Sequence, residues 1–143
     1  VESVLNIAKA ELSSKKIQVI LNLSATILVN GNRGELQQVI LNLVNNAVQA
    51  LSGVSGPSKV LQIESRDTAE GIELLVTDNG PGINSENQAH LFELLASSNK
   101  KAGMGLGLWL CHHIVSRHSG QIGYRDAPGG GAQFIISLPQ EQP

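Results

Sequence analysis

Amide side chains dominate one face of the helix that the sequence predicts from Gly34 to Leu51. At about 100° per residue, six polar side chains fall within an arc of roughly 100°: Glu35, Gln38, Asn42, Asn45, Asn46 and Gln49. A solvated helix face is normally built from Lys and Glu, whereas Asn has a poor helix propensity that costs roughly a few tenths of a kcal/mol per residue. Amide oxygens are hard ligands that suit Mg²⁺. The helix by itself leaves two interpretations open, a solvated face and a site for a metal or a polar ligand.

Two glycine-rich segments could bring the main chain close to a ligand. The first, residues 78–82, follows a predicted strand and leaves Asp78 as a fixed carboxylate at the strand end, although taken alone it favours an ordinary turn. The second, residues 103–108, precedes a predicted helix, whose free N–H groups can bind a phosphate. It lacks the Lys-Ser/Thr of a Walker loop, and no strand runs directly into it as in a dinucleotide loop. A flexible hinge remains the alternative.

The elements that must position these residues follow from periodicity and turn residues. We expect helices over residues 1–14, 34–51, 85–95 and 106–118, with Gly120 ending the last one. We expect strands over residues 17–21, 26–29, 60–66, 72–77, 121–125 and 133–138, and a mobile segment over residues 97–107. Helices and strands fall into separate runs. The sequence therefore predicts an α/β (α+β) fold, a two-layer sandwich of a mixed, largely antiparallel sheet with helices on one face.

Five segments resemble, in this order, the catalytic domain of sensor histidine kinases, within the superfamily of gyrase, Hsp90, histidine kinase and MutL ATPases. They are similar to the N box at 36–47, the G1 box at 78–83, the start of the F box at 91–93, the G2 box at 103–108 and the last glycine motif at 129–134, which leads to 138–139. Each box alone is weak evidence, and five in register at the expected spacing are strong evidence. The resemblance covers residues 17–139. Within the family, the sequence resembles the branch that contains nitrogen and oxygen sensors. The resemblance implies a Bergerat-type ATP-binding fold with a flexible lid.

The resemblance implies roles for matching residues, with ATP and Mg²⁺ as cofactors. Asn46 would coordinate the Mg²⁺ that bridges the ATP phosphates, and Asn42, one turn earlier, would line the same space. Asp78 would accept a hydrogen bond from the adenine amino group. The other implied nucleotide contacts are Gly80, Gly82 and Ile83 at the adenine pocket, and Gly103, Gly105, Leu106, Gly107 and Leu108 at the lid and phosphates.

Position 42 separates the branches of that superfamily. The gyrase-, Hsp90- and MutL-like ATPases resemble one another in a Glu there that activates water, whereas the carboxamide of Asn42 cannot act as a general base. The resemblance therefore favours phosphoryl transfer to a protein over hydrolysis, with chemistry that rests on positioning and charge neutralisation. Three departures are Gln49 in place of a common Lys, residues 94–99 in place of the usual F-box continuation, and Ala132 in place of a common Thr.

Composition limits the setting in which this chemistry would occur. A chain of 143 residues, 41% hydrophobic and 15% charged, suits one folded domain over residues 1–143, and its net charge of -2 argues against a nucleic-acid surface. Cys111 is the only cysteine, so no internal disulfide can form. Neither a signal peptide nor a membrane-length apolar run is visible, so we expect a cytoplasmic domain, whether or not the full-length protein is membrane-anchored.

The resemblance implies that the domain binds Mg-ATP and transfers the γ-phosphate to a histidine on a separate helical dimerisation domain of the same full-length protein. Residues 1–14 would lead in from that domain, homodimers would form only through it, and a response-regulator receiver domain would act downstream. None of the four histidines has a phosphoacceptor setting: His90, His112, His113 and His118. Two alternatives remain, a nucleotide-binding regulatory module with little or no transfer, and an anti-sigma-type serine kinase.

Overall fold

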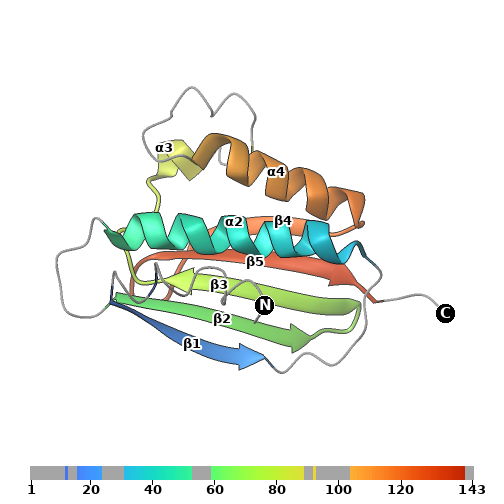
Figure 1. The fold of residues 1–143 in the computed structure, drawn as a ribbon, viewed down its shortest axis with the longest axis horizontal. Helices are drawn as coiled ribbons and strands as arrows, with labels where there is room; N and C mark the ends of the chain where they lie inside the picture. Colours follow the sequence, from blue (N-terminus) through green and yellow to red (C-terminus); the bar gives the residue numbers. More distant parts are fainter. Residues whose placement is uncertain are drawn as a thin grey trace.

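The chain folds into two layers, a five-stranded sheet and a pair of helices that cover one of its faces (Figure 1). The computed structural model describes residues 12, 16–23, 31–52, 59–88, 92 and 104–140. The strand order is β1-β2-β3-β5-β4, with β1 and β2 parallel and the other pairs antiparallel. This confirms the predicted mixed, largely antiparallel sheet. The strands are β1 (Ile17–Leu23), β2 (Lys59–Asp67), β3 (Gly71–Asp78), β4 (Gln121–Asp126) and β5 (Ala132–Pro139).

In the part of the chain that the structure describes, two long helices and one short one connect these strands. They are α2 (Arg33–Ser52), α3 (Ser85–Gln88) and α4 (Met104–Arg117), so the predicted bounds of the long helices are right to within two residues. Of the predicted helix over residues 85–95, the described part contains α3 and a turn at Phe92. The predicted strand over residues 26–29 and the predicted mobile segment up to residue 103 lie outside the described residues, as does the predicted helix over residues 1–14 apart from the buried Leu12.

Asn32 sets the start of α2 because its side chain caps the helix. The Glu35 N–H donates to Asn32 Oδ1 at 3.0 Å, which satisfies one of the free amides of the first turn. The N–H of Asn32 itself donates to His118 Nε2 at 2.9 Å. Arg117 and Glu35 form an ion pair at 3.0 Å beside this contact. The start of α2 is thereby tied to the end of α4.

The end of α4 differs in detail from the prediction. The helix ends at Arg117, and the residue that takes the left-handed conformation is Ser119, with a φ of 60°, rather than Gly120. Gly120 is required for a different reason: a Cβ there would lie 2.3 Å from the carbonyl oxygen of Ser137. The glycine therefore allows the chain that leaves α4 to pass close to β5.

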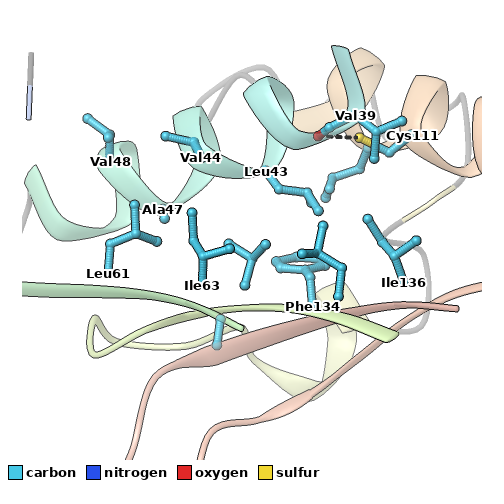
Figure 2. Packing of buried hydrophobic residues seen from close by; sticks show 14 of the residues in the cluster. Val39, Leu43, Val44, Ala47, Val48, Leu61, Ile63, Cys111, Phe134 and Ile136 are labelled. Carbon is cyan, nitrogen blue, oxygen red and sulfur yellow. Dashed lines mark hydrogen bonds between the residues drawn. The ribbon is translucent and has the colours of Figure 1, made fainter. Parts of the chain in front are cut away.

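The hydrophobic core lies between α2, α4 and the covered face of the sheet (Figure 2). Leu43 and Val44 of α2 and Leu61 and Ile63 of β2 are at most 1% exposed. Burial of each such side chain contributes about 1.5–3 kcal/mol. Because α2 is packed around most of its circumference, its remaining polar arc has a fixed direction relative to the sheet.

Candidate functional site

A cleft of about 570 Å³ opens between the C-terminal half of α2 and the end of β3. This volume is typical of a small-molecule site. Its walls come from α2, β3, β5 and the segment that follows β3. The lining residues are Leu43, Asn46, Ala47, Gln49, Ala50, Ser52, Val76, Asp78, Pro81, Gly82, Ile83, Ala132 and Phe134. Four of the residues implied by the resemblance thus line one cleft: Asn46, Asp78, Gly82 and Ile83.

Asp78 is a buried carboxylate at the end of β3 and is only 6% exposed. Its Oδ1 accepts a hydrogen bond from the Gly80 N–H at 2.9 Å. Burial raises the pKa of Asp78 above its ordinary value, and hydrogen bonds from the main chain of Gly80 and Ala132 partly offset that rise. A carboxylate in this position can accept a further hydrogen bond from a ligand in the cleft, because its two oxygens offer about four acceptor sites.

Asn46 brings an unused polar group to the same cleft. Within the described part of the chain, its Nδ2 is buried and has no hydrogen-bond partner. A buried polar group left in this state costs about 1–3 kcal/mol. The cleft is therefore suited to a ligand that presents polar atoms to Asn46, and a carboxamide can turn to offer either its nitrogen or its oxygen. This arrangement fits the implied nucleotide and its metal.

Glycines let three segments meet behind Asp78. Gly82 has a φ of 77°, as expected for the sharp turn after β3. Gly131 has a φ of 105°, and a Cβ there would lie 2.0 Å from the carbonyl oxygen of Asp78. At Gly80 a Cβ would lie 3.0 Å from Asp78 Oδ1 and 3.4 Å from the Ala50 Cβ. The backbone at the end of the cleft is therefore packed too closely for side chains.

Asn42, on the same polar arc of α2 as Asn46, contacts α4 instead of the cleft. Asn42 accepts from Gln38 Nε2 at 2.9 Å, and its own Nδ2 donates to the carbonyl oxygen of Gly107 at 3.4 Å. Asn42 does not line the cleft. Its observed role is to connect α2 with the beginning of α4.

The second glycine segment differs from the prediction in its position along the chain. Residues 104–107 form the first turn of α4 and do not precede the helix, so Gly105, Leu106 and Gly107 are helical. A Cβ at Gly107 would meet nothing within 4 Å, and the side chain of Leu108 is fully buried in the core. Gly103 lies outside the described residues.

Several residues around the cleft were not predicted as part of the site. Tyr124 accepts a hydrogen bond from the Ile83 N–H at 3.1 Å, and Gln88 Nε2 donates to the Ile83 carbonyl at 2.6 Å. Asn79 Oδ1 accepts from the Val60 N–H at 2.8 Å, which fixes the loop against β2. Two of the residues lay in segments that the sequence had singled out, Asn79 in the first glycine-rich segment and Gly131 as the third glycine of a row. Tyr124 is 41 residues from Ile83, so no local spacing indicates that contact, whereas Gln88 is only 5 residues from Ile83 and its contact is local.

A second cavity, of about 370 Å³, lies at the opposite end of the sheet. It is lined by residues 68–70, 72–73, 119–121 and 137–139, and none of the predicted site residues is among them. No cluster of three or more His, Cys, Asp or Glu side chains within the described ranges could hold a metal ion. None of the described helices has the length and apolar character needed to span a membrane.

The matched family agrees with this geometry. Residues 31–142 match the model of the histidine kinase-, DNA gyrase B-, and HSP90-like ATPase family. The chain belongs to this family of ATP-binding domains.

Relatives within the family are sensor kinases. Sensor histidine kinase TmoS of Ectopseudomonas mendocina is 33% identical over 78% of this chain and 12% of its own length. Adaptive-response sensory kinase SasA of Crocosphaera subtropica is 40% identical over 73% of this chain and 27% of its own length. The chain thus spans only a small part of these relatives.

Solved structures show the same fold. The nucleotide-free catalytic domain of histidine kinase ThkA superposes with a TM-score of 0.84 at 25% identity, covering 99% of this chain and 92% of that chain. Histidine kinase AdeS of Acinetobacter baumannii gives a TM-score of 0.75 at 28% identity, covering 97% of this chain and 62% of that chain. Together these similarities define the chain as the ATP-binding catalytic domain of a sensor histidine kinase.

Proposed function

We propose that this domain binds Mg-ATP in the 570 Å³ cleft and transfers the γ-phosphate to a histidine on a separate helical dimerisation domain. The observation that carries the proposal is the pairing, in one cleft, of the buried carboxylate of Asp78 with the unpartnered buried amide of Asn46. The first suits the amino group of an adenine, and the second suits the polar end of the nucleotide.

The cleft lining combines apolar and polar side chains, which supports this function. Val76, Ala132 and Phe134 offer an apolar surface beside Asp78, as a planar base requires. Gly82 and Ile83 also line the cleft, and Gly80 donates its N–H to Asp78. Asn46 and Gln49 lie on α2 and bring amides to the cleft. Mg²⁺ would be held there by Asn46 and would supply charge neutralisation between the phosphates.

The first turn of α4 is the proposed phosphate contact, together with Gly103. The main chain at Gly105, Leu106 and Gly107 provides N–H groups at a helix N-terminus, which favour an anion. Leu108 is the fifth residue of α4, so its N–H is used within the helix, and its buried side chain would support this turn from the core. Asn42 would set the distance between this turn and α2 through its bond to Gly107.

Transfer to a protein is favoured over hydrolysis because Asn42 provides no general base. The acceptor would be a histidine-containing helical domain, as expected for proteins built like the much longer sensor-kinase relatives. We further propose a cytoplasmic location, homodimerisation only through the helical domain, a receiver domain downstream and no nucleic-acid partner.

The proposal is tested by adding labelled ATP and Mg²⁺ to the purified chain, with and without the helical histidine domain of the same full-length protein. We expect acid-labile label on the helical domain only, at a rate that rises with its concentration. Calorimetry should detect binding of ATP and ADP at or below millimolar concentration.

The other outcomes discriminate among the remaining hypotheses. Nucleotide binding without label on the partner favours a regulatory module. Acid-stable label on serine of another protein favours an anti-sigma-type kinase. Absence of adenine-nucleotide binding at millimolar concentration would refute the proposed function.

A further inference from the structure

The main chain of Ile83 is held on both sides by side chains from other elements. Ile83 lies between β3 and α3, outside any helix or strand. Its N–H donates to the hydroxyl of Tyr124 at 3.1 Å, and its carbonyl oxygen accepts from Gln88 Nε2 at 2.6 Å. Since no regular hydrogen-bond ladder fixes this residue, these two side chains determine where its peptide groups lie.

Asp126 completes the network and fixes its direction. The Tyr124 hydroxyl donates to Asp126 Oδ1 at 3.0 Å, and Gln88 Nε2 approaches the same oxygen at 3.4 Å. A hydroxyl has one proton, so while it donates to Asp126 it must accept from Ile83. Burial raises the pKa of Tyr124, with Asp126 adding to the rise, so the donating proton is retained.

Tyr124 lies behind the wall of the cleft and does not line it. Its ring packs edge-on against Phe134, with ring centroids 5.4 Å apart and an interplanar angle of 64°. Its hydroxyl oxygen is 3.7 Å from where a Cβ on Gly82 would lie. Phe134, Gly82 and Ile83 all line the cleft, so Tyr124 contacts two lining residues, Phe134 and Ile83, and lies close to a third, Gly82.

We propose that Tyr124, assisted by Gln88, is a positioning residue for nucleotide binding that holds the Pro81, Gly82 and Ile83 wall at the spacing required by an adenine. This inference rests on the proposed function. It assigns a role to the edge strand β4, which supplies no side chain to the cleft lining. Loss of the hydroxyl frees the Ile83 amide, so the wall is no longer pre-organised and binding must restrict it again.

The variant that tests this is Tyr124→Phe, which keeps the ring against Phe134 and removes only the hydroxyl. We expect the Kd for ATP to rise about 3- to 10-fold, as for loss of one neutral hydrogen bond. Exchange of the Ile83 amide proton, measured by NMR on the free protein, should become faster. Gln88→Leu should raise the Kd as well. Because the two side chains hold the two peptide groups on either side of the same residue, Ile83, the double variant should raise the Kd by less than the product of the two single changes.

Thr68→Val is the matched control. Thr68 Oγ1 accepts from the Gly71 N–H at 3.1 Å, so this variant also removes a hydroxyl that binds a main-chain amide. Gly71 and Asp78 are at opposite ends of β3, roughly 23 Å apart at about 3.3 Å per residue. We expect Thr68→Val to lower the Tm about as much as Tyr124→Phe while leaving the Kd unchanged.

A Kd within twofold of wild type for both Tyr124→Phe and Gln88→Leu overturns the inference and leaves the proposed function intact. So does an equal rise in Kd for Thr68→Val, which would indicate a general loss of stability. A wild-type chain that binds no adenine nucleotide overturns the proposed function and the inference together. If Tyr124→Phe does not fold, Gln88→Leu and the amide exchange decide the question.

Discussion

At the scale of single residues, the cleft contains polar groups that are costly for the free protein. Burial raises the pKa of Asp78, which means that its charged form is disfavoured. The Nδ2 of Asn46 is buried without a partner among the described residues. Residues that line a cleft and have polar groups that destabilise the free fold are typical of a binding site, because a ligand can supply what those groups lack.

Asp78→Asn should therefore weaken nucleotide binding without destabilising the free protein. Loss of a hydrogen bond to a charged acceptor costs about 1.5–3 kcal/mol, or about a 10- to 150-fold rise in the Kd for ATP. The amide oxygen of Asn can still accept from Gly80, and no charge is buried, so the free energy of unfolding should not fall. Discrimination against GTP should also decrease. Calorimetry and urea unfolding provide the measurements.

The control for that variant is Asp67→Asn, an exposed residue at the other end of the sheet from Asp78. It makes the same chemical change away from the cleft lining and should leave the Kd for ATP unchanged. An unchanged ATP affinity in Asp78→Asn would remove this carboxylate from the site.

Asn46→Ala should reduce phosphoryl transfer more than it reduces nucleotide binding. The amide is assigned to the metal and so to charge that develops during transfer, where removal of one stabilising group costs about 10²-fold in rate. We expect the Kd to change by less than about 10-fold. Asn45→Ala is the control, because it makes the same substitution on the exposed neighbouring position of α2. Equal transfer rates for the two variants would indicate that the amides of α2 only form a solvated helix face.

At the scale of elements, α2 and α4 form one unit joined at three levels. At one end, His118 and Arg117 hold the start of α2. At the other end, Asn42 binds the main chain of Gly107. Between these two contacts, the Sγ of Cys111 lies 3.6 Å from the Val39 carbonyl oxygen (Figure 2). The Arg117–Glu35 pair is partly exposed and contributes little by itself. We call this contact between α2 and α4 the seam. Its buried part, around Cys111 and Val39, keeps the first turn of α4 at a fixed distance from α2.

Cys111 gives this seam a measurable pH dependence. Burial raises the pKa of its thiol from 9.0 to about 12. The folded state therefore keeps a proton that the unfolded chain loses, so the thiol's contribution to stability is complete below about pH 9 and is lost as pH rises towards about 12. The free energy of unfolding of the wild type should fall relative to Cys111→Ala above pH 9, by up to about 1.4 kcal/mol per pH unit.

Urea unfolding of both proteins between pH 7 and pH 10.5 measures this difference, since other titrating groups are common to the two. Parallel curves would contradict burial of the thiol in the seam. In the same experiment at pH 8, a thiol reagent should label the wild type only after urea has unfolded it.

At the scale of the whole molecule, the cleft joins parts of the chain that are distant in sequence. Its lining extends from Leu43 to Phe134, across α2, β3 and β5. A ligand there contacts both layers at once. Its binding free energy therefore adds to the stability of the complete fold and is not confined to one loop.

ATP with Mg²⁺ should accordingly raise the Tm of the wild type. At a free concentration 100 times the Kd the gain is about 2.7 kcal/mol, which corresponds to roughly 8–12 °C for a chain of 143 residues. Differential scanning calorimetry over a series of concentrations should follow this mass-action relation. GTP at equal concentration should give a smaller shift, and Asp78→Asn should lose most of the response to ATP. A Tm independent of ATP would be inconsistent with binding to the native state.

The sequence alone determined the elements and the order of the site segments. Hydrophobic periodicity located α2 and β3, turn residues placed Gly82 after the strand, and the amide spacing put Asn46 on one arc of the helix. These features are local, because helix faces and turns depend on residues within a few positions of one another. The five boxes are also local segments, so the sequence was sufficient to indicate the class of protein.

Only the tertiary structure decided which polar groups share the cleft and which join the helices. Asn42 lies on the same arc as Asn46, yet it binds Gly107, 65 residues away, and does not line the cleft. Tyr124 reaches Ile83 across 41 residues, and His118 reaches Asn32 across 86. Such pairs depend on the strand order β1-β2-β3-β5-β4 and on the packing of α4 across α2, which no local spacing encodes. The close approach of Gly131 to Asp78 likewise follows from the register of β3 with β5, so its physical reason appears only once the sheet is assembled.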